Sequence, residues 1–173
     1  MGTMEITSII TTVATIVGLL LVLRQVTLAR TSVEADHLRR KKDSTFTAFT
    51  LIRDKFRQLD NEILCDLELS CDSTLEKHHF DKISNNQELL IKLRRLLSNI
   101  QLMAVGVQND IYDLNVLFDL SGTTFINTFD RYFPYILDSR KQSVTFYQEA
   151  EYFINKLRSL RTSRESVIRN AKV

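Results

Sequence analysis

Three histidines and two cysteines are the side chains of this chain best suited to metal binding or nucleophilic chemistry: His37, Cys65, Cys71, His78 and His79. Zinc sites use recurring spacings such as Cys-x-x-Cys or His-x-x-x-His, and neither spacing occurs in the sequence. Adjacent histidines on a helix point about 100° apart, so His78 and His79 do not face one ion together. We therefore predict no metal site and no cofactor, and we expect both histidines of the pair to lie at the surface.

Catalytic motifs are also missing from the sequence. The chain has only four glycines, none of them clustered into a phosphate-binding loop, and it contains neither G-x-S-x-G nor H-E-x-x-H. Asp110 and Asp113 fall at an expected helix start, where carboxylates interact favourably with the helix dipole. We predict a protein that is not an enzyme. A pocket holding buried, strongly coupled carboxylates would reverse that interpretation.

A row of hydroxyl residues lies within the uncharged apolar run Ile6–Leu23. At about 100° per residue they share one sector of about 140° on a helix, and small residues there allow close helix packing. The same sector can instead line a pore, with an apolar gate near its end, or its hydroxyls can simply bond their own helix carbonyls. The residues concerned are Thr7, Ser8, Thr11, Thr12, Thr15, Gly18 and, near the gate, Val22.

Two basic clusters are the candidate contacts for an anionic ligand, although the whole chain carries a net charge of only +2. Such clusters bind the phosphates of lipid headgroups, nucleotides or single-stranded nucleic acid, or they act as solvated charges that set membrane topology. The first cluster is Arg39, Arg40, Lys41 and Lys42, and the second is Arg158, Arg161, Arg164 and Arg169.

The apolar run itself predicts a transmembrane helix over residues 1–23. A bilayer core about 30 Å thick needs about 17–25 mostly apolar residues, and Arg24 closes the run. A cleaved signal peptide is disfavoured because no basic segment precedes the run and no Ala-x-Ala follows it. The basic flank predicts a membrane protein with its N-terminus outside and residues 24–173 in the cytoplasm, where Cys65 and Cys71 stay reduced.

The remaining chain reads as one cytoplasmic helical domain, at residues 45–162, between a basic stalk (24–44) and a basic tail (163–173). The stalk has neither glycine nor proline, so the membrane helix is expected to continue through it. From Thr45 to Ser70, apolar residues at helical spacing predict a buried face, and Asp60 falls on the opposite, solvent face. That apolar face consists of Phe49, Ile52, Phe56, Leu59 and Ile63.

Capping signals and apolar spacing predict the later helices. Asn85 with Glu88 predicts a start, Asn109–Leu120 predicts a short helix, and Ser121–Gly122 predicts a break. Pro134 predicts either a kink or the first turn of a new helix, and Thr145 with Gln148 predicts the start of the last helix. The fold class is therefore all-α, with a single N-terminal transmembrane helix that continues into a helical bundle. The expected core residues are Leu89, Leu93, Leu96, Leu97, Ile100, Met103, Phe125, Phe129, Phe133, Ile136, Phe153, Ile154 and Leu157.

The order of residues from Asn99 to Lys141, NIQLMAVGVQNDIYDLNVLFDLSGTTFINTFDRYFPYILDSRK, and then FYQEAEYFINKL, resembles the domain-of-unknown-function 4760 family. The sharper positions are Ala104–Gly106, Asn109–Tyr112 and Phe133–Arg140. The resemblance implies a small bacterial or phage-associated protein with an N-terminal membrane helix and a helical cytoplasmic domain. It implies no enzymatic activity and no catalytic residues.

The chain also looks like the small membrane effector of a Hailong-type anti-phage system. That resemblance implies a homo-oligomeric, channel-like protein that an anionic, nucleic-acid-type ligand holds closed, that depolarises the membrane when activated, and that works with an operon partner protein. The alternative is a passive membrane-anchored scaffold that recruits a soluble partner. Membrane lipid is a partner under both interpretations.

Overall fold

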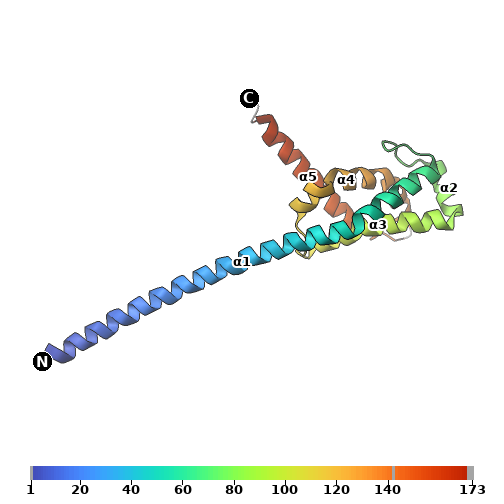
Figure 1. Cartoon of the computed structure of the whole chain (residues 1–173). Coiled ribbons are helices and arrows are strands. Elements are labelled where there is room, and N and C mark those ends of the chain that lie inside the picture. The colour runs from blue at the N-terminus through green and yellow to red at the C-terminus, as the bar shows by residue number, and fades with distance from the viewer. Residues whose placement is uncertain (1, 142, 171–173) are drawn as a thin grey trace. The chain divides into compact units, whose positions relative to one another are not determined.

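The computed structural model describes the backbone of residues 2–141 and 143–170, and the side chains in these ranges from Thr15 onward (Figure 1). Its secondary structure is helical and, within those residues, includes no strand, so the all-α prediction is confirmed. The helices are α1 (Gly2–Leu67), α2 (Lys77–Asn85), α3 (Gln87–Gln108), α4 (Leu114–Ser139) and α5 (Gln148–Asn170).

Two compact units divide the chain, Met1–Arg40 and Lys41–Val173. In the first unit, the described side chains from Thr15 to Arg40 are all exposed, including Leu19 and Leu20 at 61% and 60%. Among the described residues, one helix, α1, is long and apolar enough to cross a membrane. The same helix continues through residues 24–44, as the lack of glycine and proline there predicts.

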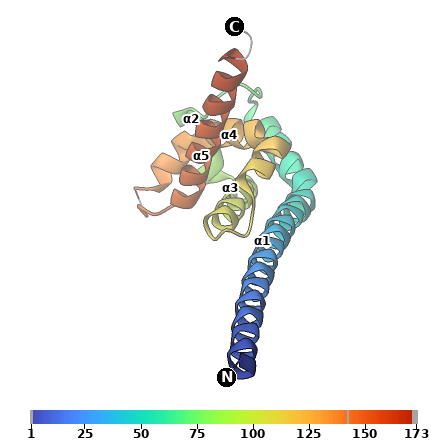
Figure 2. The ribbon, with the colours of Figure 1, turned by 90° about the vertical axis from the view of Figure 1, so that its left-hand side faces the viewer.

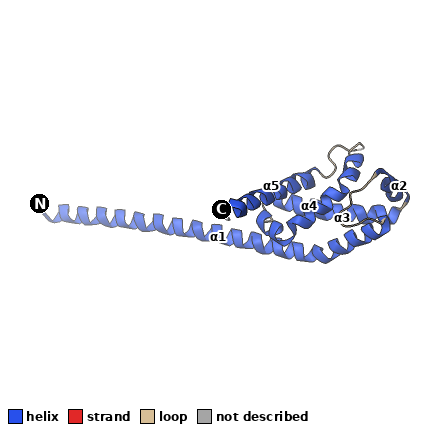
Figure 3. Cartoon of the chain, turned by 90° about the horizontal axis from the view of Figure 1, so that it is seen from above, coloured by secondary structure: helices blue, strands red, loops and turns tan. Residues whose placement is uncertain are grey.

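The second unit is a helical bundle formed by the end of α1 with α2, α3, α4 and α5 (Figure 2). Helix α5 packs against both α3 and α4, while α2 packs against α3 at one end of the bundle (Figure 3). The ring of Phe125 in α4 lies at the centre. It packs edge to face against Phe49 and Phe56 of α1 and Phe153 of α5, with centroids 6.0, 5.5 and 5.8 Å away. One aromatic residue thus ties three helices together, and the predicted apolar faces are confirmed as core.

The start of α3 differs from the prediction by one residue. The cap is Asn86, whose Oδ1 accepts a hydrogen bond from the Leu89 N–H at 3.1 Å. The predicted box between Asn85 and Glu88 is wrong, because Asn85 is the last residue of α2 and the Glu88 carboxylate forms an ion pair with Lys92 at 3.1 Å.

The predicted short helix Asn109–Leu120 is also wrong at its start. Helix α4 begins at Leu114, where the Asp113 carboxylate accepts hydrogen bonds from two N–H groups, and residues 109–113 form a turn. The break predicted at Ser121–Gly122 is a kink, since Ser121 has non-helical backbone angles (φ −164°, ψ 23°) inside α4. Pro134 lies inside α4, which ends five residues later at Ser139.

The last helix takes its cap from elsewhere in the bundle. Helix α5 begins at Gln148, and the Gln148 Nε2 donates to the Val144 carbonyl at 3.4 Å instead of forming the predicted box with Thr145. The free N–H of Ala150 donates to Oε1 of Gln101, in α3, at 3.0 Å. An α3 side chain therefore satisfies a donor that local sequence leaves open.

The prediction that both His78 and His79 lie at the surface is wrong for His79. This residue lies in α2 with 6% of its surface exposed, and its Nδ1 accepts a hydrogen bond from the Glu76 N–H at 3.1 Å. Burial, and then the neighbouring His78, lower the pKa of His79 below its ordinary value. Adjacent helix positions point apart, which explains why one histidine is buried and the other exposed.

Candidate functional site

The hydroxyl sector of α1 is described only at its later positions. The side chains of Thr7, Ser8, Thr11 and Thr12 lie outside the described residues, while Thr15, Gly18 and Val22 are exposed. A methyl group built on Gly18 meets no atom within 4 Å, so the surface there is open to close approach by another helix. Their role as pore lining or helix seam stays a prediction.

Beyond this sector, the threonines of α1 bond their own helix. The hydroxyls of Thr27 and Thr31 donate to the carbonyls of Leu23 and Leu28, both at 2.9 Å. Such bonds satisfy a hydroxyl without a neighbouring helix. They represent the simplest alternative for the hydroxyls upstream.

The first basic cluster is partly neutralised by neighbouring carboxylates. Arg40 pairs with Asp36 one turn earlier, at 3.0 Å, and Lys41 pairs with Asp110. Arg39 and Lys42 are exposed. The four residues remain candidates for phosphate contact, but two of them have acidic neighbours.

The second basic cluster is also partly neutralised by neighbouring carboxylates. Arg158 pairs with Asp130 and Arg164 with Asp119, both acidic residues of α4. The Arg164 guanidinium also lies 4.7 Å from the centre of the Phe118 ring. Arg161 is half-buried and Arg169 exposed. Exposed pairs of this kind stabilise a fold little, so an anion can compete for these arginines.

The turn between α3 and α4 is held tightly against its neighbours. The N–H groups of Ile111 and Tyr112 both donate to the Gly106 carbonyl, at 2.9 and 3.0 Å. The Tyr112 ring occupies the place where any Cβ on Gly106 would lie, so only glycine fits there. The Thr45 hydroxyl of α1 accepts from the Asp113 N–H at 2.7 Å and thereby docks the turn on α1. Gly106, Ile111 and Tyr112 are among the residues that carry the family resemblance.

Asp60 is the centre of a buried polar network, and its expected place on the solvent face is wrong. Nη1 of Arg131 donates to both Asp60 carboxylate oxygens, at 2.8 and 2.9 Å, and the Tyr132 hydroxyl donates at 2.9 Å. Arg131 is only 6% exposed, and its Nη2 donates to the Cys71 carbonyl. The network joins α1, α4 and the segment after α1.

The protonation of this network is fixed by its surroundings. Burial, and then the charge of Asp60, raise the pKa of Tyr132 far above its ordinary value, so its hydroxyl stays neutral and donates. Burial lowers the pKa of Arg131, but the hydrogen bonds and charge of Asp60 outweigh it and raise the pKa overall. Because the one carboxylate is fully paired, we assign the network a structural role.

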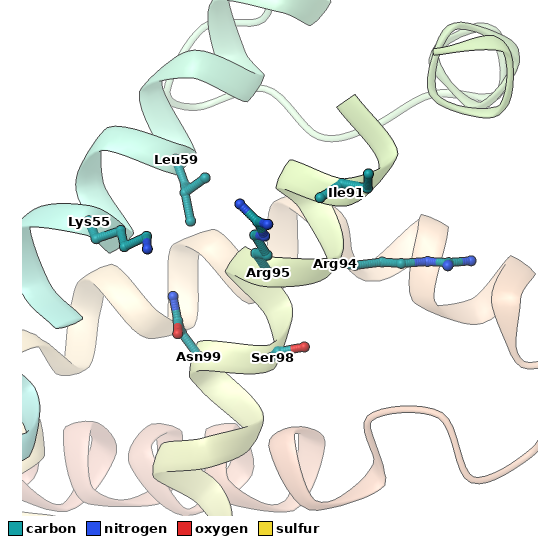
Figure 4. A pocket seen from close by; sticks show the side chains of 7 residues that line it. All are labelled: Lys55, Leu59, Ile91, Arg94, Arg95, Ser98 and Asn99. Atoms are coloured by element: carbon teal, nitrogen blue, oxygen red, sulfur yellow. The ribbon is translucent and has the colours of Figure 1, made fainter. Parts of the chain in front are cut away.

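A groove of about 570 Å³ lies between α1 and α3 (Figure 4). Lys55, Leu59, Arg95 and Asn99 point into the space between the two helices, whereas Arg94 extends away from it. Ile91 and Ser98 complete its lining. Sequence reasoning missed this site, because Lys55 and Arg95 are 40 positions apart and each looks like an ordinary exposed cation.

Within the described residues, no group of three or more histidine, cysteine or acidic side chains is arranged to hold a metal ion. Cys65 and Cys71 are free and exposed.

A family model described as Domain of unknown function (DUF4760) matches residues 8–157. The chain belongs to this family. The DUF4760 match includes the apolar run from Ser8 onward, the turn at 109–113, the Asp60 network and the groove, and it confirms the resemblance drawn from the sequence. It ends before Arg158, so the second basic cluster lies outside it.

No curated protein and no solved structure matches the chain. The DUF4760 description assigns no activity, so function has to be argued from the chain's own surfaces.

Proposed function

We propose that this protein is a single-pass protein of the bacterial inner membrane, with its N-terminus outside and its helical domain in the cytoplasm. One observation carries the proposal: apolar side chains cover every side of the described part of the run, and all of them are exposed. Moving each leucine or valine side chain out of water stabilises it by about 1.5–3 kcal/mol. Five consecutive residues, Leu19 to Leu23, make water an unfavourable surrounding for this helix. The basic flank supports the orientation.

The second part of the proposal is that several copies associate into a membrane-permeabilising, channel-like effector of anti-phage defence. The helical domain and an anionic ligand of the nucleic-acid type control the assembly. Support comes from the hydroxyl sector with open space beside Gly18, and from the resemblance to small defence effectors.

Conductance of the purified full-length protein in planar bilayers tests the channel. Replacing Thr11 and Thr15 together with leucine fills the hydroxyl sector with apolar bulk and is expected to abolish conductance while membrane insertion is retained. Val13→Leu with Ile16→Leu, on the opposite side of the helix, is the matched control and should conduct like the parent protein. Unchanged conductance of the threonine variant rules out this lining.

The alternative function is a passive anchor for a scaffold that recruits a soluble partner. The hydrogen bonds from Thr27 and Thr31 to their own helix favour it, since these hydroxyls need no neighbouring helix. Exchanging residues 1–24 for an unrelated membrane helix distinguishes the two functions. An anchor tolerates the exchange with full activity, and a channel loses activity.

A further inference from the structure

The groove between α1 and α3 is lined by basic residues without an acidic one. Three cations line it, Lys55, Arg94 and Arg95, and no acidic side chain is among its lining residues. Across the described residues, none of the three forms an ion pair with a carboxylate within 4 Å, unlike Lys41, Arg131, Arg140, Arg158 and Arg164. Lys55 and Arg95 thus place two unpaired positive charges inside the groove, and Arg94 adds a third at its edge.

Further along α1 and α3, the acidic residues already have a cationic partner. Glu62 and Asp66 of α1 and Glu88 of α3 all pair with Lys92, at 3.3, 3.2 and 3.1 Å. Asp54, next to Lys55 in the sequence, pairs with Arg53 at 2.9 Å. The positive charge of the groove is therefore left for a ligand from outside the chain.

The groove also offers the shape and polarity of a small-ligand site. Its volume of about 570 Å³ is within the range of pockets for small molecules, about 300–1,000 Å³. The Lys55 ammonium and the Arg95 guanidinium project into it with the Asn99 carboxamide (Figure 4). Guanidinium and ammonium groups are the preferred partners of phosphate oxygens. Leu59 and Ile91, the latter 40% exposed, provide an apolar wall.

We infer that this groove binds a soluble phosphate-bearing ligand of about nucleotide size. Lys55 and Arg95 hold the phosphate, Asn99 bonds a polar group of the ligand, and the apolar wall receives a ring. Arg94, which extends away from the groove, adds long-range attraction. The site deepens the ligand-controlled part of the proposed function, and it rests on that function only for the effect on the membrane.

The test is isothermal titration calorimetry of the full-length protein in a neutral detergent, with AMP, ATP and inorganic phosphate as probes. Both nucleotides are expected to bind, and inorganic phosphate is expected to bind more weakly because it lacks the ring. Lys55→Gln with Arg95→Gln should weaken nucleotide binding at least tenfold. The matched control, Arg57→Gln with Lys77→Gln, removes two exposed cations outside the groove and should bind like the parent protein. Equal melting temperatures verify that the variants are folded.

Titration with glycerophosphoglycerol, the soluble headgroup of phosphatidylglycerol, separates the two sources of phosphate. If AMP and ATP bind nothing, the inference is overturned, and headgroup binding that is lost in the groove variant then assigns the phosphate to lipid. Nucleotide binding that is equal in the groove variant and the parent protein overturns it as well. If the groove variant no longer binds nucleotide but conducts like the parent protein, the binding site is retained and its link to the membrane function is refuted. If the parent protein binds nucleotide but does not conduct, the channel function is refuted and the binding site is retained.

Discussion

Helix α1 presents two kinds of surface along one continuous element. From Thr15 to Arg40 every side chain is exposed, whereas between Lys41 and Leu67 a regular subset is buried in the bundle core. In the first part, the apolar residues Leu19 to Leu23 are contiguous and cover all sides of the helix. Those of the second part recur every three or four residues and cover one side. Helical structure is common to both parts, and the angular distribution of apolar residues decides whether a helix needs lipid or a protein core around it.

The largest expected effect comes from charging the first part of α1. Ile16→Arg with Leu20→Arg places two charges in the apolar run, each unfavourable by about 2.5–3.5 kcal/mol near the bilayer centre. We expect the protein to move from the membrane fraction to the soluble or degraded fraction, as shown by carbonate extraction and immunoblotting.

The matched control charges an exposed leucine in the second part of α1. Leu51 is 78% exposed, so Leu51→Arg should leave the protein in the membrane fraction. Equal extraction of the two variants contradicts the distinction between the two parts of the helix.

The next largest effect is expected at Asp60, where α1 is joined to the bundle. Asp60→Asn leaves Arg131 buried without its counter-charge, which typically destabilises a protein by about 3–5 kcal/mol. The melting temperature, followed by circular dichroism, should fall by several degrees. Asp54→Asn removes an exposed carboxylate from the same helix and should leave the melting temperature unchanged.

A double substitution tests the cause of that loss. Asp60→Leu with Arg131→Met removes both charges and should recover part of the lost stability, because no unpaired charge stays buried. A melting temperature of Asp60→Asn equal to that of the parent protein contradicts the structural role of the network.

The smallest effect is a pH dependence that belongs to the bundle alone. Since the pKa of His79 is lowered in the folded state, the unfolded state binds more protons as the pH falls below about 6.5. Stability is therefore fully present above that pH and decreases toward the folded-state pKa. Melting temperatures measured at pH 7.5 and 5.5 should show a smaller difference in His79→Gln than in the parent protein. An unaltered difference contradicts the assignment.

Contiguity and local spacing explain what the sequence predicts well. The apolar run, the inward face of α1 and the phenylalanine row of α4 each depend on neighbours within two helical turns. Phe125 illustrates this, since its helical spacing alone identifies it as core. The predicted helix starts are wrong by one to five residues, because neighbouring polar side chains compete for the capping position. Local sequence does not decide, for example, between Asn85 and Asn86.

Partners distant in sequence explain what could not be predicted. Asp60 looks like one more charged residue beside Arg57, and its partner Arg131 is 71 positions away. The Gln101 cap of α5 and the pair of Lys55 with Arg95 across the groove depend equally on tertiary packing. The two basic clusters, whose residues are close in sequence, could therefore be predicted. The groove, which two helices create together, could not.

The contacts of the Phe125 ring have a consequence for folding during synthesis on the ribosome. Phe49 and Phe56 leave the exit tunnel long before Phe125 and Phe153 are synthesised. At about 5–20 residues per second, the apolar face of α1 waits roughly 4–15 s for its ring partner in α4. Throughout this interval Phe49 and Phe56 lack their ring partner, so the nascent chain exposes apolar side chains beyond the basic stalk as well as in the apolar run.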